Sequence, residues 1–265
     1  MKYIIRNILV FFTSIFGLAF VYRSVLARKG PLVRVVAFHD VSDQKWFSEV
    51  IEMLVKEFNV ISPENFHAQK FQRKKINVLL SFDDGYHSWV SVALPVLHKF
   101  KLKALFFVST GLLDAASDKD ETRKYIQERL LISHKEPLSW DGLKLLSLSG
   151  HTIGGHSVTH SDLAKLPLGE AAEDVRRGKI ATEIQIGKNL LDFAYPFGRT
   201  ENYNDELNML VFDSNYRYIY SAMPGFYSVD RLLVPRTLLD SSLKPDTVRT
   251  WMYGAYDVFN FIFHR

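Results

Sequence analysis

From Pro31 onward, short apolar runs alternate with longer helix-like stretches. The apolar runs lie at 33–38, 76–82, 104–109, 152–154, 190–195, 217–221 and 232–237. The helix-like stretches lie at 46–58, 88–100, 121–131, 139–148, 169–186 and 203–213. Strands that alternate with helices are typical of parallel sheets in α/β proteins. About seven such strands predict a distorted (β/α)7 barrel of the TIM type, with an open doubly wound sheet as the alternative.

The first 30 residues form a different kind of sequence. An uncharged apolar run extends from Asn7 to Tyr22, with basic residues on both sides of it. This pattern predicts an uncleaved signal anchor over residues 1–30, or a cleaved signal peptide as the second choice. A single domain is then expected over residues 31–265. We expect that domain to lie outside the cytoplasm, tethered to the membrane by the N-terminal segment, or secreted if the segment is cleaved.

The composition excludes several classes of function. The chain has no cysteine, which rules out disulfides, iron–sulfur clusters, thiolate metal sites and a cysteine nucleophile. The net charge of +4 comes from scattered basic residues, and no nucleic-acid-binding motif is present. We therefore expect no nucleic-acid partner, and the sequence indicates no protein partner.

Polar residues gather where the predicted strands end. In parallel α/β folds the site forms at the carboxyl ends of the strands, so side chains at these positions are expected to converge. The candidates are His39 after strand 33–38, Asp83 and Asp84 after strand 76–82, His156 and His160 after the run at 152–154, the segment "YPFGR" after strand 190–195, and Arg236 within strand 232–237.

The paired aspartates and the two histidines predict a divalent metal site. His156 and His160 are four positions apart and would share one face of a helical turn. With one carboxylate they form a two-His, one-Asp set that suits zinc and leaves positions open for water or substrate. The second aspartate is then free to accept a proton from the activated water. The alternatives are two surface histidines, and aspartates that cap a helix beginning near His87.

Three motifs carry a resemblance to a known family. "SFDDGY", "HSVTH" and "FAYPFG", in this order, resemble the first three motifs of the polysaccharide deacetylase family, which is carbohydrate esterase family 4 with its NodB-homology domain. The resemblance extends from about Val33 to Val234. It implies a metal-dependent hydrolase that removes acetyl groups from N-acetylated, or sometimes O-acetylated, sugars of a polysaccharide or glycan. It also implies a distorted seven-stranded barrel.

The resemblance assigns roles to residues at matching positions. Asp83 matches the catalytic base, and Asp84, His156 and His160 match the metal ligands. The backbone N–H near Phe197 matches the donor that stabilises the oxyanion. Tyr195 and Phe197 match part of the sugar groove, with core packing as the alternative for both.

The sequence also departs from the family pattern. Ala194 and Tyr195 stand where the third motif usually has an arginine that pairs with the base, and no Leu-x-His-Asp strand end is found near the carboxyl terminus. "VVAFHDV" at 35–41 instead resembles the opening of a permuted branch, which includes poly-N-acetylglucosamine deacetylases. This implies His39 as the general acid. Arg236 is the candidate for the missing charge beside Asp83, with an exposed surface arginine as the alternative.

Two other functions are compatible with the same residues. One is a catalytically inactive carbohydrate-binding protein on the same scaffold. The other is a metal amidohydrolase that acts on a small amide. Outside the motifs, His151 is expected to be structural, Trp140 to pack at a helix start, and the charged stretch 112–136 to form a loop with a helix near the mouth.

Overall fold

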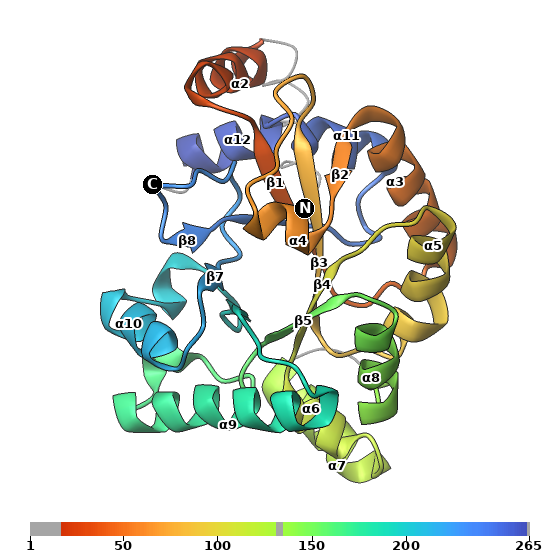
Figure 1. Cartoon of the computed structure of the whole chain (residues 1–265), viewed down its shortest axis with the longest axis vertical. Coiled ribbons are helices and arrows are strands. Elements are labelled where there is room, and N and C mark those ends of the chain that lie inside the picture. The colour runs from red at the N-terminus through yellow and green to blue at the C-terminus, as the bar shows by residue number, and fades with distance from the viewer. Residues whose placement is uncertain (1–16, 131–134, 264–265) are drawn as a thin grey trace.

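The computed structural model describes residues 17–130 and 135–263 (Figure 1). The strands are β1 (Val33–Phe38), β2 (Asn59–Ile61), β3 (Asn77–Asp84), β4 (Leu105–Val108), β5 (Thr152–Gly155), β6 (Asp192–Ala194), β7 (Tyr218–Tyr220), β8 (Leu233–Val234) and β9 (Arg236–Leu238). All the pairings between these strands are parallel. The strand order is β8-β7-β6-β5-β4-β3-β1-β9, and β2 pairs with β3 beside this path.

The sheet closes on itself through one interrupted strand. Pro235 separates β8 from β9, and proline cannot donate a ladder hydrogen bond. β8 pairs with β7, whereas β9 pairs with β1 at the other end of the strand order. The fold is therefore a nearly closed parallel barrel like a distorted TIM barrel. This confirms the predicted fold class, and the open doubly wound alternative is wrong.

Helices form the outer layer of the barrel (Figure 1). They are α2 (Leu18–Lys29), α3 (Gln44–Glu57), α4 (Pro63–His67), α5 (Leu94–Lys99), α6 (Thr110–Ala115), α7 (Lys119–Tyr125), α8 (Trp140–Leu148), α9 (Leu168–Ile186), α10 (Asp205–Asp213), α11 (Pro245–Met252) and α12 (Ala255–Phe263). Short turns of π-helix, η1 (Trp89–Ala93) and η2 (Ile126–Leu130), and of 3₁₀-helix, η3 (Leu163–Lys165) and η4 (Thr200–Asn202), extend this layer. β2, α4, α6, α11 and α12 were not predicted from the sequence.

The strands bury apolar side chains on both faces. Because successive residues of a strand point to opposite faces, most of the strands contribute to two apolar clusters. Val36, Phe38, Leu80 and Phe82 belong to the cluster shared with the helices. Val35, Leu79, Leu105, Phe107 and Tyr220 belong to the smaller cluster in the barrel interior, together with Phe66 of α4. Burial on both faces explains why these strands read as continuous apolar runs.

The predicted N-terminal anchor is only partly described. Residues 1–16, which hold most of its apolar run, lie outside the described residues. The described part includes α2, where Tyr22 packs against Phe226 with 6.1 Å between ring centroids. Among the helices of residues 17–130 and 135–263, none is both long and apolar enough to cross a membrane.

Candidate active site

β3 carries both aspartates to the mouth of the barrel. Asp83 and Asp84 are its last two residues and lie in register with Phe107 and Val108 of β4. Both are 3% exposed. Asp84 has a φ of 86°, in the left-handed region, and Gly85 follows with a φ of 123°. This turn sends the two carboxylates to different partners within the same mouth.

The capping alternative for the aspartates is wrong. The first helical turn after β3 is η1, whose N-cap residue is Ser88 and which has no side-chain cap hydrogen bond. The carboxylates instead contact side chains from distant parts of the chain: Asp83 contacts Arg236, and Asp84 contacts the two histidines.

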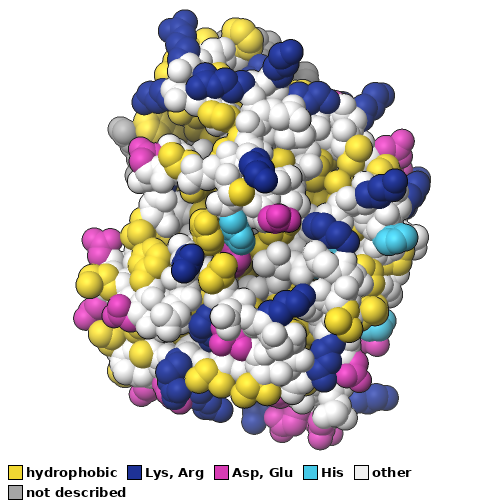
Figure 2. All heavy atoms as spheres, in the orientation of Figure 1, with side chains coloured by type: hydrophobic (Ala, Val, Ile, Leu, Met, Phe, Trp, Pro, Cys, Tyr) yellow, Lys and Arg dark blue, Asp and Glu magenta, His cyan; other side chains and the backbone are white. Residues whose placement is uncertain are grey.

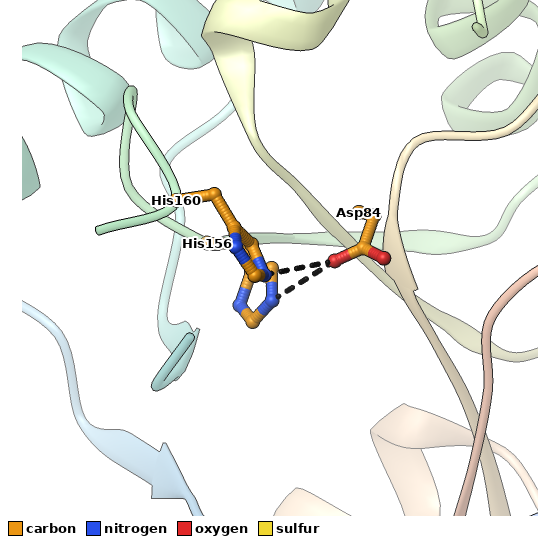
Figure 3. Close-up of side chains that lie close together, drawn as sticks. All are labelled: Asp84, His156 and His160. Carbon is orange, nitrogen blue, oxygen red and sulfur yellow. Dashed lines mark ion pairs between the residues drawn. The ribbon is translucent and has the colours of Figure 1, made fainter. Parts of the chain in front are cut away.

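Asp84, His156 and His160 form a buried cluster (Figure 3). The Oδ1 atom of Asp84 lies 3.4 Å from Nε2 of His156 and 3.2 Å from Nε2 of His160. The three possible ligand atoms all lie within 4.8 Å of one another. The histidines are not on a helical turn, as the spacing suggested, but in the loop after β5. Ser157 and His160 in this loop have φ values of 66° and 52°.

Hydrogen bonds on the far side of each ring orient the cluster. Nδ1 of His156 lies 2.7 Å from the carbonyl oxygen of Ala194, and Nδ1 of His160 lies 3.3 Å from that of Arg129. Since a carbonyl can only accept, each Nδ1 carries a proton, and in the neutral form of each ring the lone pair of Nε2 is turned toward Asp84.

These three atoms fit a divalent cation. Asp84 Oδ1 is buried and accepts no hydrogen bond within the described part of the chain, whereas Oδ2 accepts one from the hydroxyl of Tyr86 at 2.7 Å. A carboxylate oxygen and two imidazole lone pairs that face one another repel unless a positive charge lies between them. Two imidazoles and one carboxylate are also the donor set of open zinc sites.

The electrostatics of the cluster agree with its geometry. Burial alone would raise the pKa of Asp84, but a positive charge at His160 and the two nearby imidazoles hold this pKa well below its usual range, so a positive charge beside Asp84 stabilises the carboxylate. The pKa of the Tyr86 hydroxyl is raised by burial and by the adjacent Asp84 carboxylate, which keeps that hydroxyl a donor. Strong mutual shifts in a buried group of this kind mark candidate functional sites.

Arg236 forms a buried ion pair with Asp83. Its Nη1 lies 2.6 Å from Asp83 Oδ1, and its Nε donates to the carbonyl of Ser221 at 2.9 Å. The guanidinium lies 5.1 Å from the centroid of the Phe107 ring. The Arg236 side chain is buried, so the exposed alternative for this residue is wrong.

His39 lies at the same mouth. It follows β1, whose last residue, Phe38, is in register with Phe82, the residue before Asp83. Its backbone carbonyl accepts a hydrogen bond from Trp89 Nε1 at 3.0 Å. His39 is half-buried and close enough for its positive charge to lower the pKa of Asp84. Figure 2 shows histidine and acidic side chains together near the centre of this face.

The two aromatic residues of the third motif lie in different places. Phe197 is 39% exposed, and its ring centroid lies 4.9 Å from that of His160. Its φ is 60°, and among the hydrogen bonds of the described residues none uses its backbone N–H. Tyr195 is buried; its hydroxyl donates to Asn208 and its ring stacks on Tyr203. Tyr195 therefore packs in the core, as the alternative to the sugar groove expected.

Two contacts at the site were not anticipated from the sequence. Tyr86 lies within the "SFDDGY" motif, two positions after Asp84, and this spacing was the available signal. Lys135 reaches Asp40 beside His39, with 2.7 Å between Nζ and Oδ2. This ion pair brings the charged stretch 112–136 to the rim, as expected, although no local pattern identified Lys135.

The fold and the site together define a class: a parallel α/β barrel with a candidate divalent-metal site at the carboxyl ends of its strands. A profile of the family described as "Polysaccharide deacetylase" matches residues 70–219, more than half of the chain. The chain belongs to the polysaccharide deacetylase family.

Individual relatives agree with this family. The chain is 24% identical over 177 residues to the protein YxkH of Bacillus subtilis, a match that covers 66% of this chain and only 56% of that relative. Among solved structures, the deacetylase PplD of Streptococcus pyogenes in complex with acetate has a TM-score of 0.67 at 21% identity, covering 83% of this chain and 98% of that one. IcaB from Ammonifex degensii has a TM-score of 0.68 at 22% identity, covering 85% and 98%. At these identities the structural likeness shows the fold.

Proposed function

We propose that this chain is a metal-dependent hydrolase that removes acetyl groups from N-acetylated sugars of a polysaccharide or glycan. The observation that carries the proposal is the separation of two adjacent carboxylates. Asp84 faces two imidazole lone pairs, whereas Asp83 faces Arg236. One carboxylate is thereby placed to hold a cation and the other to accept a proton. The family match supports the acetylated saccharide as substrate.

Asp84, His156 and His160 would hold the cation. A divalent metal in this position would polarise the acetyl carbonyl and lower the pKa of a water in the site. We propose zinc, because two neutral imidazoles and one carboxylate suit its ligand preferences. The carbonyl oxygens of Ala194 and Arg129 keep the imidazoles in the tautomer that binds a metal.

Asp83 is the proposed general base. It takes a proton from the attacking water, and its ion pair with Arg236 fixes the orientation of the carboxylate. The backbone N–H of Phe197 donates to the oxyanion that develops on the acetyl carbonyl. His39 donates a proton to the sugar nitrogen as the C–N bond breaks, so acetate and the free amine result. The exposed ring of Phe197 contributes to the sugar groove.

The location of the reaction is also part of the proposal. We infer that the segment 1–30 anchors the chain to the membrane and that the barrel acts on a glycan outside the cytoplasm. The uncharged apolar run of this segment supports the membrane anchor.

Acetate release from N-acetylated glycans by the zinc-loaded full chain tests the proposal. The wild-type chain is expected to release acetate from such glycans and much less from small acetamides. Activity on small acetamides alone would identify an amidohydrolase instead. Saccharide binding without acetate release by a metal-loaded chain would identify an inactive binding protein. Either result would overturn the proposed function.

A further inference from the structure

Helix α2 is apolar on two faces. One face packs on the barrel, where Ala19 is buried and Tyr22 and Leu26 contact the core. The outer face carries exposed apolar side chains, which are Leu18, Phe20, Val21 and Val25. A helix on the surface of a globular protein typically turns polar residues outward, and a contiguous apolar patch marks a protein or membrane contact. The outer face of α2 therefore indicates an interaction surface.

α12 extends this surface. It packs beside α2 at the same end of the molecule (Figure 1). The Tyr22 ring lies over the turn between α11 and α12, where a Cβ atom at Gly254 would come within 3.3 Å of it. Phe261 and Ile262, near the end of α12, are 62% and 49% exposed. We call the exposed apolar side chains of the two helices, with these two residues included, the α2–α12 surface.

A buried ion pair holds α12 in place. Nη1 and Nη2 of Arg34 on β1 lie 3.0 and 2.6 Å from the two carboxylate oxygens of Asp257 on α12. The same guanidinium lies 4.0 Å from the centroid of the Phe226 ring, on which Tyr22 of α2 also packs. A bidentate arginine–carboxylate pair fixes geometry as well as charge. The α2–α12 surface is therefore a fixed part of the barrel.

Basic side chains border this surface. Arg28 and Lys29 lie in the last turn of α2. The exposed run "RKK" at 73–75 leads into β3, which pairs with β1 from its first residue, so this run lies at the strand ends that α2 adjoins. Asp230 lies near Lys29 and offsets one of these charges. Figure 2 shows Lys and Arg side chains among hydrophobic ones at this end. Apolar side chains bordered by cations suit an anionic lipid surface.

The apolar run of the proposed anchor has no linker between it and the barrel. The run extends from Asn7 to Tyr22, whereas α2 begins at Leu18 and is already packed on the barrel. The last part of the run is therefore part of the packed helix. A bilayer that holds the preceding part of the run would lie directly against α2, and against α12 beside it.

We propose that the α2–α12 surface and the basic run at 73–75 contact an anionic lipid bilayer, so that the barrel lies on the membrane and does not hang from a flexible tether. The proposal rests on the proposed membrane anchor and not on the deacetylase chemistry. β1 separates this surface from the catalytic mouth, because α2 precedes the amino end of β1 and His39 follows its carboxyl end. The mouth thereby stays open to water while lipid covers the α2–α12 surface.

Spin labels on the full chain test this contact. The chain has no cysteine, so one introduced cysteine carries one label. Ile262→Cys is the probe, in chains reconstituted into vesicles of phosphatidylcholine and phosphatidylglycerol. Ile184→Cys is the matched control, because Ile184 is 75% exposed on α9, at the opposite end of the molecule (Figure 1). Power saturation compares collisions of each label with oxygen, which dissolves in lipid, and with a nickel chelate, which stays in water.

We expect the label at Ile262 to lose most of its access to the nickel chelate in vesicles and to keep its access to oxygen. The label at Ile184 should keep its access to both. Changing all three residues at 73–75 to glutamine should return the nickel chelate to the label at Ile262. The control for this change is a triple glutamine variant of exposed basic residues on α7, namely Lys119, Arg123 and Lys124.

Equal access of the nickel chelate to both labels, in chains that float with the vesicles, would overturn the contact and leave the anchor in place. Loss of access to both oxygen and chelate at Ile262 would identify a protein cover, either the segment 1–16 or a second copy, and would also overturn the contact. An unchanged label at Ile262 in the 73–75 variant would overturn the role of the basic run. Chains that do not float would overturn the anchor and the contact together. Acetate release from a soluble glycan, measured on the same samples, shows separately whether the deacetylase function fails.

Discussion

Nη1 of Arg236 lies 2.6 Å from Oδ1 of Asp83, and the two residues are 153 positions apart in the chain. Arg236 begins β9, which pairs with β1, and β1 pairs in turn with β3, the strand that ends in the aspartates. Barrel closure thus brings an arginine from the last strand to the proposed base. The motif "FAYPFG", which lacks the usual arginine, does not need to supply that charge.

Breaking this ion pair should be costly. Arg236→Gln leaves the Asp83 carboxylate buried without its cation, and removing one partner of a buried pair typically destabilises by about 3–5 kcal/mol. Urea unfolding of Arg236→Gln, Asp83→Asn and the double variant measures the coupling between the two residues. We expect the double variant to be more stable than the sum of the single effects. Additive effects would show that the two side chains act independently.

Tyr86 should control how tightly a metal binds. Tyr86→Phe removes the hydroxyl that donates to Asp84 Oδ2 at 2.7 Å but keeps the buried ring. Loss of such an outer hydrogen bond typically weakens metal affinity about 10–100-fold. Competition with a chelator measures the change, with Tyr203→Phe as a tyrosine control away from the cluster. Unchanged zinc affinity in Tyr86→Phe would contradict this role.

The role of His39 should depend on the leaving group. His39→Ala removes the proposed proton donor, so hydrolysis of an N-acetyl sugar should slow by about 10²–10⁴-fold, the typical size of general acid–base catalysis. An aryl acetate has a leaving group that needs no proton, and its hydrolysis should slow far less. Steady-state rates on both substrates give the comparison. An equal loss on both would indicate that His39 positions the site without donating a proton.

His151 should make the fold sensitive to acid. Burial, with a smaller effect of the Lys103 charge, lowers its pKa from 6.5 to about 4. Between these two pH values the imidazole is protonated in the unfolded chain but not in the folded one. The free energy of unfolding therefore decreases as the pH falls from 6.5 toward about 4. His151→Asn keeps an acceptor for the N–H of Ala104 but cannot bind the proton.

Urea unfolding between about pH 7 and about pH 4 measures this effect. The wild-type chain should lose up to about 1.4 kcal/mol per pH unit more than His151→Asn in the middle of that window. Equal slopes for the two proteins would show that burial does not lower the pKa of His151.

The barrel could be predicted from the sequence because its strands are buried on both faces. The apolar run at 33–38 corresponds to β1, and the run at 232–237 was predicted as one strand, whereas Pro235 divides it into β8 and β9. β2 and α4 were missed because they are only three and five residues long. Segments of this length are too short to display a period.

The site was predictable in its residue types and less so in its geometry. Asp84, His156 and His160 carry metal-binding chemistry in their side chains, so the motifs sufficed to identify them. The left-handed φ of Asp84, which separates it from Asp83, has no signature in the residue type. A tyrosine is compatible with a sugar groove and with the core, so the residue type of Tyr195 does not decide between them. Its tertiary contacts place it in the core.

Metal content per chain, measured by elemental analysis beside acetate release, tests the central claim most directly. The zinc-loaded full chain is compared with Asp83→Asn and Asp84→Asn, two identical changes at neighbouring buried positions. We expect about one zinc per chain in the wild type and in Asp83→Asn, little in Asp84→Asn, and no acetate release from either variant. Loss of zinc from both variants, or full activity in Asp83→Asn, would contradict the division of metal binding and proton transfer between the two aspartates.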